Sequence, residues 1–383
     1  MSTFSGSKPK FSQIREKFPD LLFGKDSVVK KTLLLILLLL TLPALCFSAS
    51  AESPAPAASP APASVLQELL SRAGSEGGDA SLPRVIDRIH DPDACPDFAF
   101  SGEDDLLEIW FPPIRDQDAA IFLYQGQVWM LDCGDERARL DTVPLLKYLG
   151  IDHIDRLINT HPHHDHLNGL YSIDEAAPVG ELLVCFPEGE TAHMAAAMEY
   201  CKGNGIPVGT FGDEEILSMG DGLVTFTAWL KCSEDETLNN RSAAFMVGYG
   251  DASFLSLADI ELPGQQQLAD ALDPEALKAD ILRYPHHGMQ HMVSALYRAV
   301  DPDLVIVTNA PRLYEMKDAS RFLDYRHASV AYTYRNSHVL HLTTDGTRWL
   351  CEELAFDPTP WLPAELPTEL PTDLPAELPA EAE

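Results

Sequence analysis

Metal-binding side chains are concentrated in one short stretch of the sequence, Thr160–His166, which reads T-H-P-H-H-D-H. The apolar run Ile151–Ile158 precedes it and predicts a short buried strand that opens into a loop. In the spacing H-x-H-x-D-H, the first two histidines lie on one side of an extended backbone, whereas the Asp and the last His begin the next turn. Two such donor pairs suit two metal ions about 3.5–4 Å apart. The candidate ligands are His161, His163, Asp165 and His166. The alternative is a polar surface loop with an accidental cluster of histidines.

This spacing resembles the metallo-β-lactamase superfamily, whose hallmark is H-x-H-x-D-H after a strand, and all four positions are filled here. The resemblance implies an αββα sandwich, in which two mixed sheets are flanked by helices. It also implies that Asp132, in Asp132-Cys133-Gly134, lies beneath the metals and accepts a hydrogen bond from a ligand imidazole. Thr160 is the second residue expected to support the ligands, and the alternative for Asp132 is a carboxylate that closes a turn.

The chain is strongly acidic, with a formal net charge of −32 over 383 residues. An acidic surface keeps a protein soluble and repels polyanions unless cations intervene. Nucleic acid is therefore a less favoured substrate than the motif alone would suggest.

The N-terminal part has the pattern of an export signal. Lys30 and Lys31 precede the apolar run Thr32–Pro43, and Ala49-Ser50-Ala51 offers a cleavage site. Residues 1–51 are thus expected to be a signal peptide, with an uncleaved N-terminal anchor as the alternative. Either places the rest of the chain outside the cell or on the extracellular face of its envelope, with membrane contact only through this segment.

Composition divides the rest of the chain into a linker, a domain and a tail. Residues 52–100 begin with a Pro/Ala-rich linker and continue as a loosely ordered segment, and residues 101–355 form the predicted hydrolase domain. Residues 356–383 carry an acidic Leu-Pro repeat with a period of four, which predicts a disordered tail that acts as a spacer or as a weak ligand for cations or partners.

Six cysteines follow the leader, and an even number in an exported protein permits disulfides. The candidate pairs are Cys185 with Cys201, which flank one helical stretch, and Cys95 with Cys351, which bracket the domain. The alternative is that these residues are mostly buried thiols.

Strand and helix patterns alternate between the leader and the tail. Hairpins are predicted at residues 119–131 and 243–258, helices at 141–149 and 191–202, and strands at 106–111, 181–186, 223–230 and 277–283. Alternation of this kind predicts layered α/β structure.

The second half of the chain supplies the remaining donors. Asp259 ends the second hairpin, where the superfamily carries a carboxylate that bridges both metals, although a helix N-cap is the alternative. Tyr284 to Gly288 reads Y-P-H-H-G. Together with the strand at 303–308 and the hairpin at 339–349, this motif resembles the extracellular hydrolase domain of DNA-uptake competence channel proteins and the teichoic-acid phosphorylcholine esterases. The resemblance covers residues 106–353.

By that resemblance, His287 is the metal ligand and His286 faces the pocket, with the reverse assignment left open. One metal is then expected to bind His161, His163 and Asp259, and the other to bind Asp165, His166, Asp259 and His287. Many superfamily members carry a further metal-binding His just before the second hairpin, where this chain has Asn239-Asn240-Arg241-Ser242. Asn240 and Arg241 are instead candidates for holding a substrate phosphate, and His193 is expected to lie away from the site.

These residues predict a hydrolase that holds two divalent metals, most simply Zn²⁺ with Mn²⁺ as an alternative. The expected reaction is attack of a metal-bound hydroxide on a phosphoester of a small molecule or of the cell envelope. Asp165 would orient or deprotonate the water, and His286 would assist the departing oxygen. The alternatives are an extracellular nuclease, a β-lactam or lactone hydrolase, or a non-catalytic envelope protein that uses the fold for binding. Sequence does not define the oligomeric state.

Overall fold

A computed structural model describes residues 85–88, 106–232, 235, 237–311, 316–334 and 338–362. The chain divides into residues 1–76 and 77–383, and every described residue belongs to the second unit. The predicted signal peptide, most of the predicted linker and most of the predicted tail lie outside the described residues.

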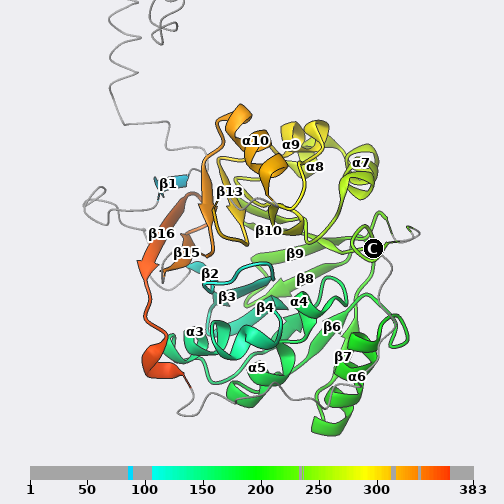
Figure 1. Ribbon diagram of the computed structural model, residues 1–383, viewed down its shortest axis with the longest axis vertical. Helices are drawn as coiled ribbons and strands as arrows, with labels where there is room; N and C mark the ends of the chain where they lie inside the picture. Colours follow the sequence, from blue (N-terminus) through cyan, green and yellow to red (C-terminus); the bar gives the residue numbers. More distant parts are fainter. Residues whose placement is uncertain are drawn as a thin grey trace, which may run out of the picture. The chain divides into compact units, whose positions relative to one another are not determined.

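Two mixed sheets form the centre of this unit (Figure 1). The nine-stranded sheet has the order β1-β16-β15-β2-β3-β4-β5-β6-β7, and the seven-stranded sheet has the order β14-β13-β12-β11-β10-β9-β8. Their strands are β1 (Val85–Arg88), β2 (Leu107–Phe111), β3 (Ala119–Tyr124), β4 (Gln127–Cys133), β5 (Arg156–Ile158), β6 (Leu182–Val184), β7 (Val208–Thr210), β8 (Ile216–Met219), β9 (Val224–Trp229), β10 (Ala244–Tyr249), β11 (Ala252–Ser256), β12 (Ile281–Arg283), β13 (Leu304–Val307), β14 (Val330–Tyr332), β15 (His338–Thr344) and β16 (Trp349–Ala355).

Helices cover the outer face of each sheet. Figure 1 shows α3, α5 and α6 against the nine-stranded sheet and α7 to α10 against the seven-stranded sheet. The described helices are α3 (Thr142–Tyr148), α4 (His164–Leu167), α5 (Leu170–Ala176), α6 (Ala192–Asn204), α7 (Leu262–Ala271), α8 (Pro274–Leu277), α9 (Ser294–Val300) and α10 (Lys317–Arg326), with 3-10 turns η1 (Glu136–Arg139), η2 (His286–Gly288) and η3 (Thr359–Trp361). The predicted αββα sandwich is therefore confirmed.

Three apolar clusters hold these four layers together. The cluster between the sheets is rich in aromatic side chains, such as Phe122, which meets Phe226 at a centroid distance of 4.9 Å and Phe254 at 6.1 Å. The other two clusters lie between each sheet and its helices, with Leu146 in one and Leu296 in the other. Aromatic pairs of this kind contribute about 0.5–1.5 kcal/mol each beyond the burial of their area.

The fold brings several strand ends to one edge of the sandwich, here called the loop edge. Strands β4 and β5 are parallel neighbours in one sheet, and β11, β12 and β13 are parallel neighbours in the other. Because parallel strands end at the same edge, the loops that follow them meet there. The predicted strand at 151–158 contributes only β5, since Asp152 and His153 are exposed and Ile154 forms a single bridge to Val179.

The opposite edge, here called the turn edge, is held by contact between two hairpin turns. The backbone carbonyl of Gly346, in the β15–β16 turn, accepts hydrogen bonds from the amides of Asp251 (2.7 Å) and Ala252 (3.2 Å), in the β10–β11 turn. A Cβ on Gly250 would lie 2.5 Å from the same carbonyl oxygen, so only glycine permits this approach. The two sheets are thus joined by backbone at the edge away from the loops.

Both ends of the predicted domain differ in the structure. Strand β1 lies within the predicted linker and pairs with β16. The chain also continues beyond residue 355 into η3, and Phe356 is buried against Tyr148 with a ring distance of 5.6 Å. Among the described helices, none is both long enough and apolar enough to cross a membrane.

The predicted disulfide between Cys185 and Cys201 is wrong, because both residues are free thiols. The thiol of Cys185 lies 3.5 Å from the carbonyl oxygen of Thr160, and Cys201 is buried in α6. Cys95, the predicted partner of Cys351, lies outside the described residues, so that pairing stays a prediction.

Candidate metal centre

Four side chains from both sheets converge at the loop edge. Asp165 and His166 belong to α4, which follows β5, whereas Asp259 follows β11 and His287 follows β12. Their donor atoms all lie within 4.8 Å of one another. The shared oxygen is Oδ2 of Asp259, which lies 3.2 Å from Nε2 of His166 and 3.3 Å from Nε2 of His287. Nε2 of His287 also lies 3.2 Å from Oδ2 of Asp165. The structure thus brings together the set predicted for one metal.

Two buried atoms of this cluster fit a cation. Nε2 of His166 and Oδ1 of Asp259 have no hydrogen-bond partner among the described residues, although their residues are at most 1% exposed. An unsatisfied buried polar atom costs about 1–3 kcal/mol. Imidazole and carboxylate donors suit zinc and similar divalent ions, so the residues present fit the predicted metal.

His161 and His163 lie beside this cluster. Nε2 of His161 is 4.0 Å from Oδ2 of Asp259 and 2.9 Å from Nδ1 of His163. The rings of His161 and His166 are 4.1 Å apart. The three residues predicted for the other metal are therefore adjacent, with Asp259 between the two sets.

His286 and His287 differ in burial, although they are neighbours in sequence. The side chain of His287 is 3% exposed and its Nε2 faces Asp165 and Asp259, whereas the side chain of His286 is 24% exposed. Nε2 of His286 lies 3.9 Å from Asp259, and its Nδ1 lies 3.6 Å from Glu261. This geometry favours His287 as a ligand and His286 as a residue that faces a substrate.

Asp132 supports the histidine motif from beneath. Its Oδ2 lies 2.8 Å from Nδ1 of His166 and accepts a hydrogen bond of 2.7 Å from the hydroxyl of Thr160. Its Oδ1 accepts the backbone N–H of Thr160 at 2.8 Å and the amide of Asn159 at 3.2 Å. A carboxylate on Nδ1 fixes the ring so that Nε2 is directed toward a metal. Asp132 and Thr160 thus occupy the supporting places that the sequence predicts.

The backbone is left-handed at several of these positions. The φ angles are +55° at Asp132, +45° at Ala258, +50° at His286 and +48° at His287. Such conformations cost about 1–3 kcal/mol each for residues other than glycine, and they cluster at functional sites. The strain accompanies the turn of each loop toward the centre of the site.

The charges of the cluster depend strongly on one another. Burial opposes ionisation of Asp259, but His287 and His166 outweigh it and hold the pKa of Asp259 well below its usual range. Burial likewise opposes the charged form of His166, but Asp259, Asp132 and Asp165 raise its pKa well above the usual value. Metal ligands must be deprotonated, so a cation that enters this cluster releases protons from the imidazoles.

The predicted substrate residues are placed differently. Asn240 is 2% exposed, and its Oδ1 accepts the backbone amides of Glu261 and Gly264 at 3.1 Å each. Its amide donates to Asp235, so Asn240 anchors the loop after Asp259 and the start of α7, in place of the predicted contact with phosphate.

Arg241 forms an ion pair with Glu190 and lies over the ring of Phe186. These contacts give its guanidinium a partner within the protein. His193 is nearer to the motif than predicted, because its Nδ1 lies 3.1 Å from Oδ1 of Asn168 and its ring lies 5.9 Å from that of His164.

Sequence reasoning missed three residues beneath the cluster: Asp118, Arg283 and Thr308. Nδ1 of His287 lies 3.0 Å from the hydroxyl of Thr308. Arg283 is the last residue of β12 and lies three residues before His286. Its place at the end of a strand that leads to the His pair is the sequence feature from which it could have been predicted. Burial lowers the pKa of Arg283 to about 9, so its guanidinium is still charged at neutral pH.

Comparisons with known proteins agree with this fold. The family model described as the metallo-beta-lactamase superfamily matches residues 115–190, which include the H-x-H-x-D-H stretch. No curated protein matches the chain significantly.

Many solved structures resemble the chain. One is the metallo-beta-lactamase fold protein YhfI from Bacillus subtilis, with 14% identity, a TM-score of 0.42, and coverage of 62% of this chain and 99% of that one. Another is a diphosphatase of the PhnP family, with 13% identity, a TM-score of 0.36, and coverage of 52% and 85%. A third is a putative metal-dependent hydrolase from Parabacteroides distasonis, with 14% identity, a TM-score of 0.39, and coverage of 60% and 94%.

The chain therefore has a metallo-β-lactamase-type fold, with a cluster of side-chain donors that fits a metal ion.

Proposed function

We propose that this chain is a phosphoesterase that acts with two divalent metal ions, zinc being the simplest choice. The observation that carries the proposal is the cluster of Asp165, His166, Asp259 and His287, whose donor atoms converge from two sheets and leave buried atoms unsatisfied. His161 and His163 supply the donors for the second ion. The competence-channel and phosphorylcholine-esterase branch suggested by Pro285–Gly288 is part of this proposal.

Bound divalent ions would lower the pKa of water and offset negative charge on phosphate oxygens. The chain's own residues would do the rest. Asp165 is 17% exposed at the side chain and would orient or deprotonate a water molecule near the cluster. Burial lowers the pKa of His286, so the imidazole is neutral at pH 7 and offers an N–H to a departing or non-bridging oxygen.

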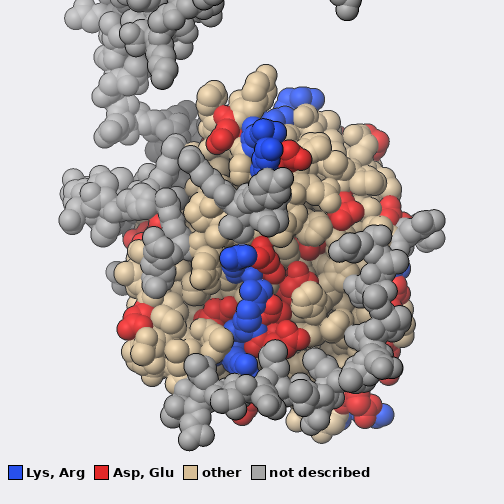
Figure 2. Space-filling view, viewed as in Figure 1, with Lys and Arg blue, Asp and Glu red and all other residues tan. Residues whose placement is uncertain are grey.

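The charge distribution favours a small or envelope-linked phosphoester over nucleic acid. On the face drawn in Figure 2, basic side chains form a short column in the middle, and acidic side chains border it. Strands of DNA or RNA bind along continuous basic surfaces. With a net charge of −32, the chain would repel a polyanion at long range.

The test is to assay bis-p-nitrophenyl phosphate, plasmid DNA and nitrocefin side by side, with the metal content of the same protein measured by plasma mass spectrometry. We expect about two metal ions per chain, hydrolysis of the phosphodiester, and a loss of about 10²–10⁴-fold in rate for Asp165→Ala. Asp270→Ala is the control, because Asp270 is an exposed residue of α7 that accepts a hydrogen bond from Gln266 and is not part of the proposed site. Unchanged phosphodiesterase activity in Asp165→Ala would refute the assignment.

The other outcomes identify the competing functions. Turnover of DNA alone would indicate a nuclease, and turnover of nitrocefin alone would indicate a lactam hydrolase. A folded chain without metal and without activity would indicate an envelope protein that uses the fold for binding.

We also propose that the protein is exported. The support is the basic pair Lys30 and Lys31, the apolar run Thr32–Pro43 and the following Ala49-Ser50-Ala51. N-terminal sequencing of protein recovered from outside the cell should begin after residue 51. A chain retained inside the cell with Met1 intact would contradict export.

A further inference from the structure

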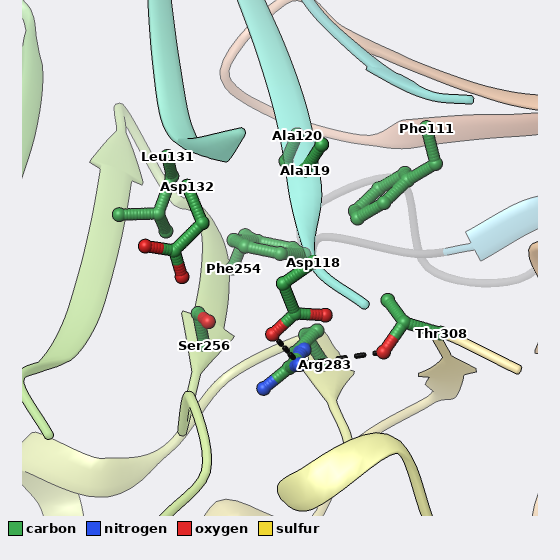
Figure 3. Close-up of a pocket in the computed structure, with 10 residues that line it drawn as sticks. All are labelled: Phe111, Asp118, Ala119, Ala120, Leu131, Asp132, Phe254, Ser256, Arg283 and Thr308. Atoms are coloured by element: carbon green, nitrogen blue, oxygen red, sulfur yellow. Dashed lines mark hydrogen bonds and ion pairs between the residues drawn. The ribbon is translucent and has the colours of Figure 1, made fainter. Parts of the chain in front are cut away.

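A buried ion pair lies directly beneath the proposed metal centre. Asp118 precedes β3 in the nine-stranded sheet, and Arg283 ends β12 in the seven-stranded sheet. Their side chains are 7% and 3% exposed and form an ion pair. Figure 3 shows the two side chains in contact, joined by a dashed line, with Asp132 and Ser256 among the other residues that line the same small pocket. The pair therefore links the two sheets beneath the predicted ligands.

Arg283 lies beside the oxygen of Asp259 that is turned away from the ligands. Its guanidinium donates to the carbonyl oxygen of Ala258 and to the hydroxyl of Thr308, and it lies 3.6 Å from Oδ1 of Asp259. The other oxygen, Oδ2, is the one that faces His166 and His287. The guanidinium thus lies on the Oδ1 side of the carboxylate, at ion-pair distance without a hydrogen bond, and Oδ2 is directed toward the centre.

Asp118 lies on the far side of the ligand imidazoles. Its Oδ1 is 3.5 Å from Nδ1 of His287, and its Oδ2 is 3.7 Å from Nδ1 of His166. In both rings, Nδ1 is the atom opposite the Nε2 that faces Asp259. These are ion-pair distances and not hydrogen bonds, because Nδ1 of His287 already has the hydroxyl of Thr308 at 3.0 Å and Nδ1 of His166 has Asp132 at 2.8 Å. Asp118 therefore acts on the rings through its charge.

The positive charge of Arg283 also offsets part of the negative charge around the cluster. Asp118, Asp132, Asp165 and Asp259 place four carboxylates around the cluster. Without a cation these groups repel one another in a poorly solvated space. Asp118, Asp132 and His166 could themselves be read as a third cation site, but the guanidinium of Arg283 already provides the positive charge beside Asp118.

We propose that Arg283 and Asp118 are positioning residues of the metal centre, with Arg283 presenting Oδ2 of Asp259 and Asp118 holding the guanidinium of Arg283 in place. This inference rests on the proposed function, since it concerns the affinity and geometry of the metals proposed there. It predicts that loss of this pair weakens metal binding, whereas loss of an ion pair elsewhere in the nine-stranded sheet does not.

The test is a titration of the metal-free full-length chain with Co²⁺, followed by visible absorption, which reports the coordination geometry. The variants are Asp118→Asn, Arg283→Lys, Arg283→Met and the double variant Asp118→Asn/Arg283→Met. The control is Arg156→Met/Glu181→Gln, which removes a partly exposed ion pair of 2.8 Å between Arg156 in β5 and Glu181, the residue before β6.

We expect Asp118→Asn and Arg283→Met to weaken Co²⁺ binding by about 10–100-fold and to shift the absorption bands. Arg283→Lys should restore part of the affinity, because it returns the charge but not the planar fork of donors. The control pair should bind Co²⁺ as the wild type does. Wild-type affinity and spectra in Asp118→Asn and Arg283→Met would overturn the inference.

The double variant covers the case in which Arg283→Met fails to fold because it leaves Asp118 buried without a partner. It removes both charges, so a purely structural pair would then leave Co²⁺ binding unchanged, and that result would overturn the inference. A wild-type chain that binds no Co²⁺ would overturn the metal centre itself. Two bound ions in the wild type, with unaffected variants, would overturn only the role of Arg283 and Asp118.

Discussion

His341 lies on the nine-stranded sheet between two carboxylates and stacks on Trp110. The ring centroids are 3.7 Å apart, and its Nε2 lies 2.8 Å from Glu108. Burial opposes the charged imidazole, but Glu108 and Glu352 outweigh it and raise the pKa of His341. The hydrogen bond from His341 in turn lowers the pKa of Glu108.

These shifts predict a pH window for stability. The raised pKa of His341 stabilises the fold fully below the unfolded value of about 6.5, and this contribution is lost as the pH rises through the folded pKa. The lowered pKa of Glu108 contributes above about 4.3 and is lost as the pH falls through its folded pKa. His341→Gln should therefore destabilise the protein by more at pH 5.5 than at pH 9, with a difference of about 1 kcal/mol.

Urea unfolding of both proteins at the two pH values measures this difference. The stacking on Trp110 is lost at both, so it cancels in the comparison. An equal effect of His341→Gln at pH 5.5 and pH 9 would contradict a charged imidazole.

At the scale of single residues, the sequence predicts the metal-binding side chains that belong to a recognisable motif. The four donors in Thr160–His166, together with Asp259 and His287, all lie at one place. Asp118 and Arg283 could not be found in this way, because an aspartate before one strand and an arginine at the end of another become neighbours only when the sheets pack. The roles of the donors stay predictions until metal is measured.

At the scale of elements, Gly169 determines how closely the motif approaches β4. Its amide donates to the carbonyl oxygen of Gly134 at 2.9 Å. A Cβ at this position would lie 1.8 Å from the carbonyl oxygen of Cys133, so only glycine allows the start of α5 to pack there. This approach holds α4, with Asp165 and His166, against the end of the strand that carries Asp132.

Gly169→Ala should lower the free energy of unfolding by about 1–3 kcal/mol or more, because backbone must move to admit the methyl group. Gly189→Ala is the control, since no atom lies within 4 Å of the added Cβ, and it should change stability by less than about 0.5 kcal/mol. Thermal unfolding of the two variants measures the difference. Equal melting temperatures would contradict the close approach.

Helices and strands with clear hydrophobic periodicity and clear turn or cap residues were predicted from the sequence, whereas elements without these features were not. The hairpin of β3 and β4 and the helix α6, capped by Thr191 and ended by Gly205, follow from turn and cap residues. Helix α7 was missed because Pro263 and Gly264 near its start resemble a loop. The structure explains Gly264, since a Cβ there would lie 2.7 Å from Oδ1 of Asn240.

At the scale of the whole molecule, the proposed ions would connect the two sheets. Asp165 and His166 follow a strand of one sheet, and Asp259 and His287 follow strands of the other. A ligand that binds only the folded state stabilises it by about 2.7 kcal/mol at a free concentration of 100 times its Kd. Removal of metal by a chelator should therefore lower the melting temperature, and added Zn²⁺ should restore it in a concentration-dependent way.

Calorimetry with and without chelator measures this effect, and the Asp259→Asn variant serves as the comparison. In that variant the melting temperature should respond much less to Zn²⁺. A wild-type melting temperature that is independent of both chelator and Zn²⁺ would contradict a shared ion between the sheets.

The contact between the β10–β11 turn and the β15–β16 turn bears on the direction from which a substrate would approach the proposed metal centre. Gly346 closes the turn edge by backbone hydrogen bonds and the donors lie at the loop edge, so under the proposed function a substrate would approach from the loop edge. There it meets the partly exposed His286 and Asp165 before it meets Asp259, which is 1% exposed. Under the proposed function, substrates of different size and shape would therefore be distinguished by the side chains at the loop edge.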